Sequence, residues 1–254
     1  GVTQDKAAST RFNYEAGKRS DIPPDYYDKQ ENYTIGTAVK NNELIEQTGR
    51  QLGEHCKRLG VHFNFAPVVD ITTTPLYPII GNRSFGAGRE NVTNKAVAFM
   101  NGMQSAGVLA NAKHFPGHGD TDQDSHKTLP TINFTEKRID SVELYPYKKL
   151  IKEGLSSVMV AHLNVPSLES KPGYPSSLSE YIVTDILKER LDFQGLIFTD
   201  ALTMKGASDF SETGAIDLAA FMAGNDVMLM SEDVGLGISK ITNAYNNGEI
   251  SEER

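Results

Sequence analysis

The segment spanning residues 113–126 carries the side chains best suited to chemistry. It reads Lys-His-Phe-Pro-Gly-His-Gly-Asp-Thr-Asp-Gln-Asp-Ser-His and is rich in histidine and aspartate. Asp124 and His126 are two residues apart in an extended loop, so their side chains point to the same side and can form a carboxylate–imidazole hydrogen bond. Such a pair fixes the tautomer of the ring and raises its basicity. His126 could then protonate a leaving group and later take a proton from water.

The same segment also has partial features of a metal site. Its aspartates at 120, 122 and 124 imitate the first ligands of a calcium loop, but the loop's glycine and its final glutamate are missing. His114 and His118 have the spacing of a helical zinc pair, but Pro116 and Gly117 between them oppose a helix. We therefore expect no metal here, and a solvated acidic loop is the alternative to a catalytic one.

A second carboxylate, Asp200, ends the apolar run Gly195–Thr199. An aspartate at the end of a buried strand could be a second carboxylate of a site shared with Asp124 and His126. It can equally cap the helix that follows. The residue taken by itself favours capping, and its chemical role depends on the rest of the chain.

The elements that must position these residues alternate along the chain. Apolar residues recur at helical spacing and are followed by short, almost continuous apolar runs, which indicates parallel strands covered by helices. We predict helices at 41–59, 91–106, 135–153 (bent at Pro146), 179–191 and 214–223, and strands at 61–67, 108–114, 157–162, 195–200 and 226–230. The fold class is therefore α/β.

Polar residues follow the carboxyl ends of the predicted strands. They are Asp70, Lys113, His114, His162, Asp200 and Ser231. Ligand sites of (β/α)₈ barrels and open α/β sheets collect at that end, so we expect one shared pocket. Asp70 could instead brace its loop, and His162 could be a hydrogen-bonded core residue without a ligand.

Composition excludes several classes of protein. The chain has 254 residues, a net charge of −8 and no basic cluster, which argues against a nucleic-acid partner. No apolar run is long enough to span a membrane, and no export signal is evident at the start. The single cysteine, Cys56, cannot form an internal disulfide. The compartment stays open, with the cytoplasm favoured over the periplasm.

The motifs together resemble those of glycoside hydrolase family 3, and more narrowly its β-N-acetylglucosaminidase (NagZ-type) branch. The resemblance runs from about Asn41 to Glu249. It rests on Asn-Phe-Ala-Pro-Val-Val-Asp at 64–70, Asn-Arg-Ser-Phe-Gly at 82–86, Lys-His-Phe-Pro-Gly-His-Gly-Asp-Thr at 113–121, Asp-Ser-His at 124–126, Val-Ala-His at 160–162 and Ile-Phe-Thr-Asp-Ala-Leu-Thr-Met at 197–204. The Asp-Ser-His element marks this branch.

The resemblance implies a role for each matching residue. Asp200 corresponds to the nucleophile, His126 to the general acid/base and Asp124 to the residue that orients its ring. Three more residues correspond to substrate ligands: Arg83, Lys113 and His114. The implied reaction is hydrolysis of terminal β-linked N-acetylglucosamine with retained configuration, from peptidoglycan fragments or chitooligosaccharides. It needs a carbohydrate substrate and neither cofactor nor metal.

The chain also departs from the family pattern. A (β/α)₈ TIM-type barrel has eight strands, and the five readable here match the family's fourth to eighth, so we expect an incomplete barrel over residues 36–254. Residues 1–35 are predicted to be an irregular arm without the family's aspartate-containing third-strand motif, and 249–254 to begin the last barrel helix. The alternatives are a relative with another hexose specificity or phosphorolytic activity, or an inactive carbohydrate-binding fragment. The oligomeric state stays open.

Overall fold

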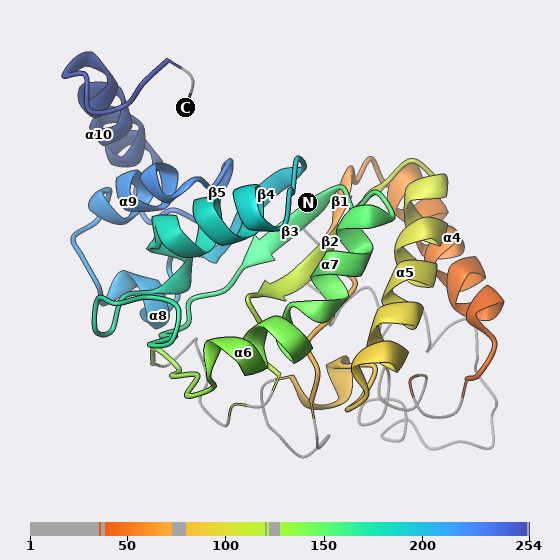
Figure 1. The fold of residues 1–254 in the computed structure, drawn as a ribbon. Coiled ribbons are helices and arrows are strands. Elements are labelled where there is room, and N and C mark those ends of the chain that lie inside the picture. The colour runs from red at the N-terminus through yellow and green to blue at the C-terminus, as the bar shows by residue number, and fades with distance from the viewer. Residues whose placement is uncertain (1–35, 37–38, 73–79, 120, 122–127, 253) are drawn as a thin grey trace. The chain divides into compact units, whose positions relative to one another are not determined.

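The computed structural model describes residues 36, 39–72, 80–119, 121, 128–252 and 254 (Figure 1). The predicted arm at 1–35 lies outside these residues, and so do Asp124 and His126. The chain forms two compact units, which we describe separately. The first takes in residues 1–120 and 140–157, and the second takes in residues 121–139 and 158–254.

The first unit contains a pair of parallel strands with helices beside them. Its elements are α4 (Asn42–Arg58), β1 (Phe63–Asn64), the 3-10 turn η1 (Gly81–Arg83), α5 (Arg89–Ser105), β2 (Leu109–Phe115) and α7 (Tyr145–Lys152). Strand β1 pairs with β2, so that Phe63 lies opposite Leu109 and Asn64 opposite Ala110. Every residue of β2 after Leu109 is buried. A strand enclosed in this way is typical of a parallel sheet covered by helices.

Helices α4 and α5 approach each other through glycine. A Cβ atom on Gly49 would lie 2.2 Å from the carbonyl oxygen of Phe99, and one on Gly102 would lie 1.9 Å from that of Glu46. Because any side chain would collide with the opposite backbone, these glycines set the helix spacing. Helix α4 begins where the Asn41 side chain accepts the Glu43 N–H at 2.9 Å.

The helix predicted at 135–153 is divided into three segments. They are α6 (Glu136–Arg138), the π-helix η2 (Ile139–Glu143) and α7. The break falls at Leu144, and Pro146 lies in the first turn of α7. Proline lacks the N–H that a helix interior needs but is favoured in a first turn. The predicted bend near Pro146 is therefore confirmed, and it takes the form of one helix ending and the next one beginning.

The second unit follows the same strand–helix alternation. It contains most of β3 (Ser157–Val160), the 3-10 turn η3 (Ser176–Leu178), the π-helix η4 (Tyr181–Arg190), β4 (Leu196–Ala201), α8 (Lys205–Ser208), α9 (Ala215–Ala223), β5 (Val227–Leu229) and α10 (Val234–Asn246). Strand β4 lies between β3 and β5. It pairs in parallel with β5, with a shift of register between Phe198 and Ala201.

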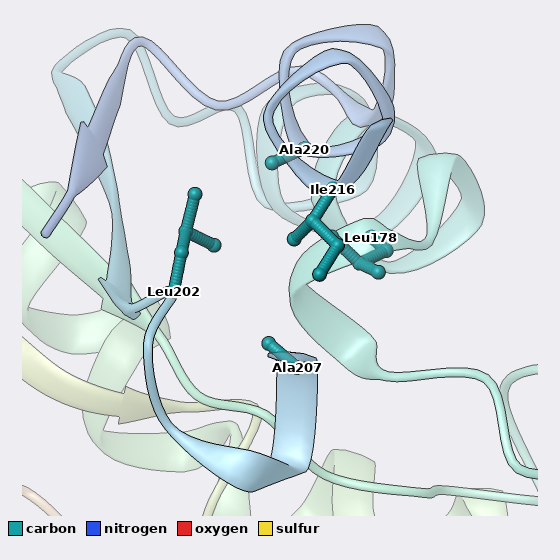
Figure 2. Packing of buried hydrophobic residues seen from close by; sticks show 5 residues of the cluster. All are labelled: Leu178, Leu202, Ala207, Ile216 and Ala220. Atoms are coloured by element: carbon teal, nitrogen blue, oxygen red, sulfur yellow. The ribbon is translucent and has the colours of Figure 1, made fainter. Parts of the chain in front are cut away.

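A small hydrophobic core holds the end of β4 against the helices of the second unit (Figure 2). It consists of Leu178, Leu202, Ala207, Ile216 and Ala220, which come from η3, the residue after β4, α8 and α9. This core fixes the chain directly after Asp200.

The carboxyl-terminal helix differs from the prediction. Helix α10 begins after Asp233, whose side chain accepts the Leu236 N–H at 2.9 Å. Residues 249–252 and 254 are outside any helix, so the prediction that a helix begins at 249 is wrong. In the part of the chain that the structure describes, no helix is both long and apolar enough to cross a membrane.

Candidate active site

Asp70 connects the residues after β1 with the end of β2. Its Oδ2 atom lies 2.6 Å from Nδ1 of His114 and accepts the His114 backbone N–H at 3.2 Å. Its Oδ1 atom accepts the His118 backbone N–H at 2.7 Å. The Asp70 side chain is fully enclosed and that of His114 is 7% exposed. Asp70 therefore braces its loop and cannot reach a substrate, which was one of the two interpretations of the sequence.

The surroundings of Asp70 keep it ionised. Burial acts to raise the pKa of the carboxyl, but the charge and hydrogen bond of His114, together with His118, outweigh it and lower the pKa below its usual value. Burial, assisted by the negative charge of Asp70, raises the pKa of Tyr147 well above its usual range. The site thus contains a carboxylate–imidazole pair beside a protonated phenol.

Arg83 lies on a turn that is fastened to the same residue. The neighbouring Ser84 donates its hydroxyl to the Asp70 carbonyl at 2.6 Å and accepts the Gly86 N–H at 3.0 Å. The Gly86 carbonyl in turn accepts the Thr72 N–H at 3.2 Å. Asp70 therefore positions the Arg83 turn through its backbone and His114 through its side chain.

Lys113 is part of β2 and is 5% exposed. Its carbonyl accepts the Val69 N–H at 2.8 Å, and its ammonium lies 5.9 Å from the centre of the Phe65 ring. The peptide bond between Lys113 and His114 is cis. The structure thus brings two of the predicted substrate ligands, Lys113 and His114, to the end of one strand.

Asp200 lies at the end of β4 in the second unit and is partly exposed. Its Oδ1 accepts the N–H of the next residue, Ala201, at 2.9 Å. The preceding Thr199 is buried, and its hydroxyl oxygen accepts the Leu229 N–H from β5 at 3.0 Å. Residues 200–201 are still strand, and α8 starts at Lys205, so the capping role is not observed.

His162 is fully buried just after β3. Its Nδ1 lies 2.6 Å from the Ser177 hydroxyl and its Nε2 lies 3.0 Å from the Ala201 carbonyl oxygen. Both ring nitrogens thus have protein partners, as expected of a hydrogen-bonded core histidine.

The predicted acid/base pair, Asp124 and His126, lies outside the described residues and stays a prediction. The pair of Asp70 and His114, which are far apart in the sequence, was not predicted. The available signal was their common place at the carboxyl ends of adjacent strands.

Parallel strands, intervening helices and polar groups at the strand ends define a domain of the (β/α)-barrel class. Among solved structures, the glycoside hydrolase family 3 β-N-acetylglucosaminidase from Paenibacillus sp. str. FPU-7 is similar, with a TM-score of 0.83 and 36% identity over 88% of this chain and 43% of that one. The Mycobacterium tuberculosis protein LpqI is similar with a TM-score of 0.80 and 31% identity over 88% of this chain and 66% of that one. The predicted fold, an incomplete α/β TIM-type barrel, is confirmed.

The profile of the glycosyl hydrolase family 3 N-terminal domain matches residues 31–254. The chain therefore belongs to glycosyl hydrolase family 3, as its motifs indicated. Beta-hexosaminidase A of Pseudoalteromonas piscicida is 36% identical over 211 residues, which are 78% of this chain and 35% of that protein. The beta-hexosaminidase of Methylococcus capsulatus is 37% identical over 185 residues, 73% of this chain and 54% of that protein. The chain thus spans about a third to a half of these relatives.

Proposed function

We propose that this chain is the catalytic barrel domain of a retaining glycoside hydrolase that releases terminal β-linked N-acetylglucosamine. The observation that carries the proposal is the Asp200 carboxylate, held at the end of β4 by the Ala201 N–H, in a chain of this family. The relatives named beta-hexosaminidase support the choice of sugar. Peptidoglycan fragments or chitooligosaccharides would supply such termini.

In the proposed reaction the Asp200 carboxylate attacks the anomeric carbon as the bond to the leaving oxygen breaks. His126, oriented by Asp124, gives its proton to that oxygen, and the sugar becomes covalently attached to Asp200. His126 then takes a proton from water, and the water oxygen displaces Asp200. Two displacements at one carbon retain its configuration.

Three further residues would hold the sugar. The Asp70 carboxylate occupies Nδ1 of His114, so a sugar hydroxyl would bind at Nε2. Lys113 at the same strand end and Arg83 on the turn fastened to Asp70 would donate hydrogen bonds to other hydroxyls or to the acetamido group.

The test is release of the aryl group from an aryl N-acetyl-β-glucosaminide, compared with the aryl β-glucoside, with and without inorganic phosphate. We expect faster release from the acetamido sugar, no need for phosphate, and a β-configured first product by NMR. Asp200→Ala should lower kcat at least about a thousandfold. A preference for glucoside, dependence on phosphate, or normal turnover of Asp200→Ala would contradict the proposal.

A further inference from the structure

The residue after Asp200 is held at both of its peptide groups. The Ala201 N–H donates to Oδ1 of Asp200 at 2.9 Å, which orients the carboxylate. The Ala201 carbonyl lies 3.0 Å from Nε2 of His162 and also accepts the Met204 N–H at 2.9 Å. The Leu202 N–H, which belongs to the same peptide group as that carbonyl, donates to the Leu229 carbonyl of β5 at 2.8 Å. The position of Ala201 therefore contributes to where the Asp200 carboxylate lies.

The hydrogen bonds define the state of the His162 ring. A carbonyl oxygen only accepts, so Nε2 carries the proton and donates it to Ala201. In the neutral ring Nδ1 is then an acceptor, and the Ser177 hydroxyl 2.6 Å away donates to it. Both His162 and Ser177 are fully buried, and the Ser177 carbonyl accepts the Asn225 side-chain N–H at 2.8 Å. The two contacts thus fix the orientation of the ring and, in its neutral form, its tautomer.

We propose that His162 is a positioning residue for Asp200, acting through the Ala201 carbonyl, with Ser177 fixing its ring. The proposal rests on the proposed function, since it takes Asp200 as the nucleophile. A nucleophile must come within about 3–3.5 Å of the carbon that it attacks, and a displacement of 1 Å can cost about a hundredfold in rate. A hydrogen bond one residue away from the carboxylate is well placed to prevent such a displacement.

Two substitutions of His162 by an amide side chain distinguish a role in positioning Asp200 from a role that only fills the core. In His162→Gln the side-chain amide reaches about as far as Nε2 and can still donate to the Ala201 carbonyl. In His162→Asn the amide reaches only as far as Nδ1, so it keeps the contact with Ser177 and loses the one with Ala201. We expect His162→Asn to lower kcat about tenfold or more with KM changed less than about twofold, and His162→Gln to retain most of kcat.

A second measurement needs no activity. Asp200-Ala201 is the only Asp-Ala pair in the sequence, so labelling aspartate carbonyls with ¹³C and alanine nitrogens with ¹⁵N isolates the Ala201 amide in an NMR spectrum of the whole chain. Its signal reports the hydrogen bond to the Asp200 carboxylate. We expect the signal to move in His162→Asn and to keep its wild-type position in His162→Gln.

The outcomes are distinct. An unmoved Ala201 signal in His162→Asn, or equal changes in both variants, would overturn the positioning role and leave His162 as core filling. If the wild-type chain releases no aryl group from either sugar, the proposed function fails, and the NMR measurement still decides the positioning. If His162→Asn does not fold, Ser177→Ala replaces it, because it frees the ring and leaves the Ser177 carbonyl bond to Asn225 in place. A shifted Ala201 signal in that variant supports the proposal and an unshifted one overturns it.

Discussion

Removal of the Asp70 carboxylate should destabilise the first unit. Asp70→Ala deletes a buried carboxylate that makes three hydrogen bonds. Its partners are the His114 ring, the His114 backbone N–H and the His118 backbone N–H. The two backbone N–H groups then stay buried without this acceptor, because the side chain at 70 is fully enclosed. The loss is therefore larger than that of an exposed ion pair.

The magnitude follows from these three bonds. A hydrogen bond to a charged acceptor contributes about 1.5–3 kcal/mol, and a buried donor left without its acceptor costs about 1–3 kcal/mol. We expect Asp70→Ala to lower the free energy of unfolding by about 3–5 kcal/mol. Asp70→Asn keeps one carbonyl oxygen for the His118 N–H and should cost about half as much.

The assay is urea unfolding of the whole chain followed by circular dichroism. Glu54→Gln is the matched control, because Glu54 is exposed on α4 of the same unit and its loss should change the free energy of unfolding by less than about 0.5 kcal/mol. A change below about 1 kcal/mol in Asp70→Ala would refute the bracing role.

Replacement of the Asp70 carboxylate also has a pH signature, which Asp70→Asn tests. The folded pKa of Asp70 is lowered, so its stabilisation is present above the unfolded pKa of about 3.9 and is lost as pH falls through the folded pKa. The difference in free energy of unfolding between wild type and Asp70→Asn should shrink below about pH 4. A difference that stays constant down to acid unfolding would contradict this origin.

Three further predictions concern the acid/base, the helix contact and the core. His126→Ala should lose more activity the higher the pKa of the leaving group, and an equal loss across a series of aryl glycosides would argue against its acid role. Gly102→Ala should lower Tm clearly, since the added methyl meets the α4 backbone, whereas Gly88→Ala, with no heavy atom nearer than 3.8 Å to the added Cβ, should not. Ile216→Ala should lower the free energy of unfolding, measured with urea, by about 2–4 kcal/mol, because Ile216 belongs to the hydrophobic core in Figure 2. Met222 is 43% exposed on the same helix, so Met222→Ala should lower it by less than about 0.5 kcal/mol. Equal losses in the two variants would refute this core.

Much of the fold could be predicted because helix ends carry strong local signals. Glycines that directly follow the predicted helices have positive φ, for instance 70° at Gly60 and 116° at Gly224, a conformation that glycine adopts without strain and that ends a helix. Helix α10 was missed because Gly235 and Gly237 lower helix propensity in its first turn. Its capping residue, Asp233, was the available signal.

The candidate site was predicted less completely, for a different physical reason. Residue types and strand ends indicate which side chains can do chemistry, as with Asp200 and Lys113. Which atoms meet depends on contacts between distant segments, such as the one between Asp70 and His114. The same holds for His162, whose hydrogen bond to Ala201 spans 39 residues.

The position of Asp70 also limits how the substrate range of this domain can be altered. Enzyme engineers often treat strand-end loops as interchangeable modules on a constant scaffold. Here the Arg83 turn and the His114 ring are not separate modules, because Ser84 and His114 both bond to Asp70. A library of variants in which Ser84 of the Arg83 turn is replaced would shift Asp70 and so also disturb the His114 ring. Substitutions at 84 and 114 should therefore show epistasis, and productive libraries should keep Asp70 and Ser84 constant.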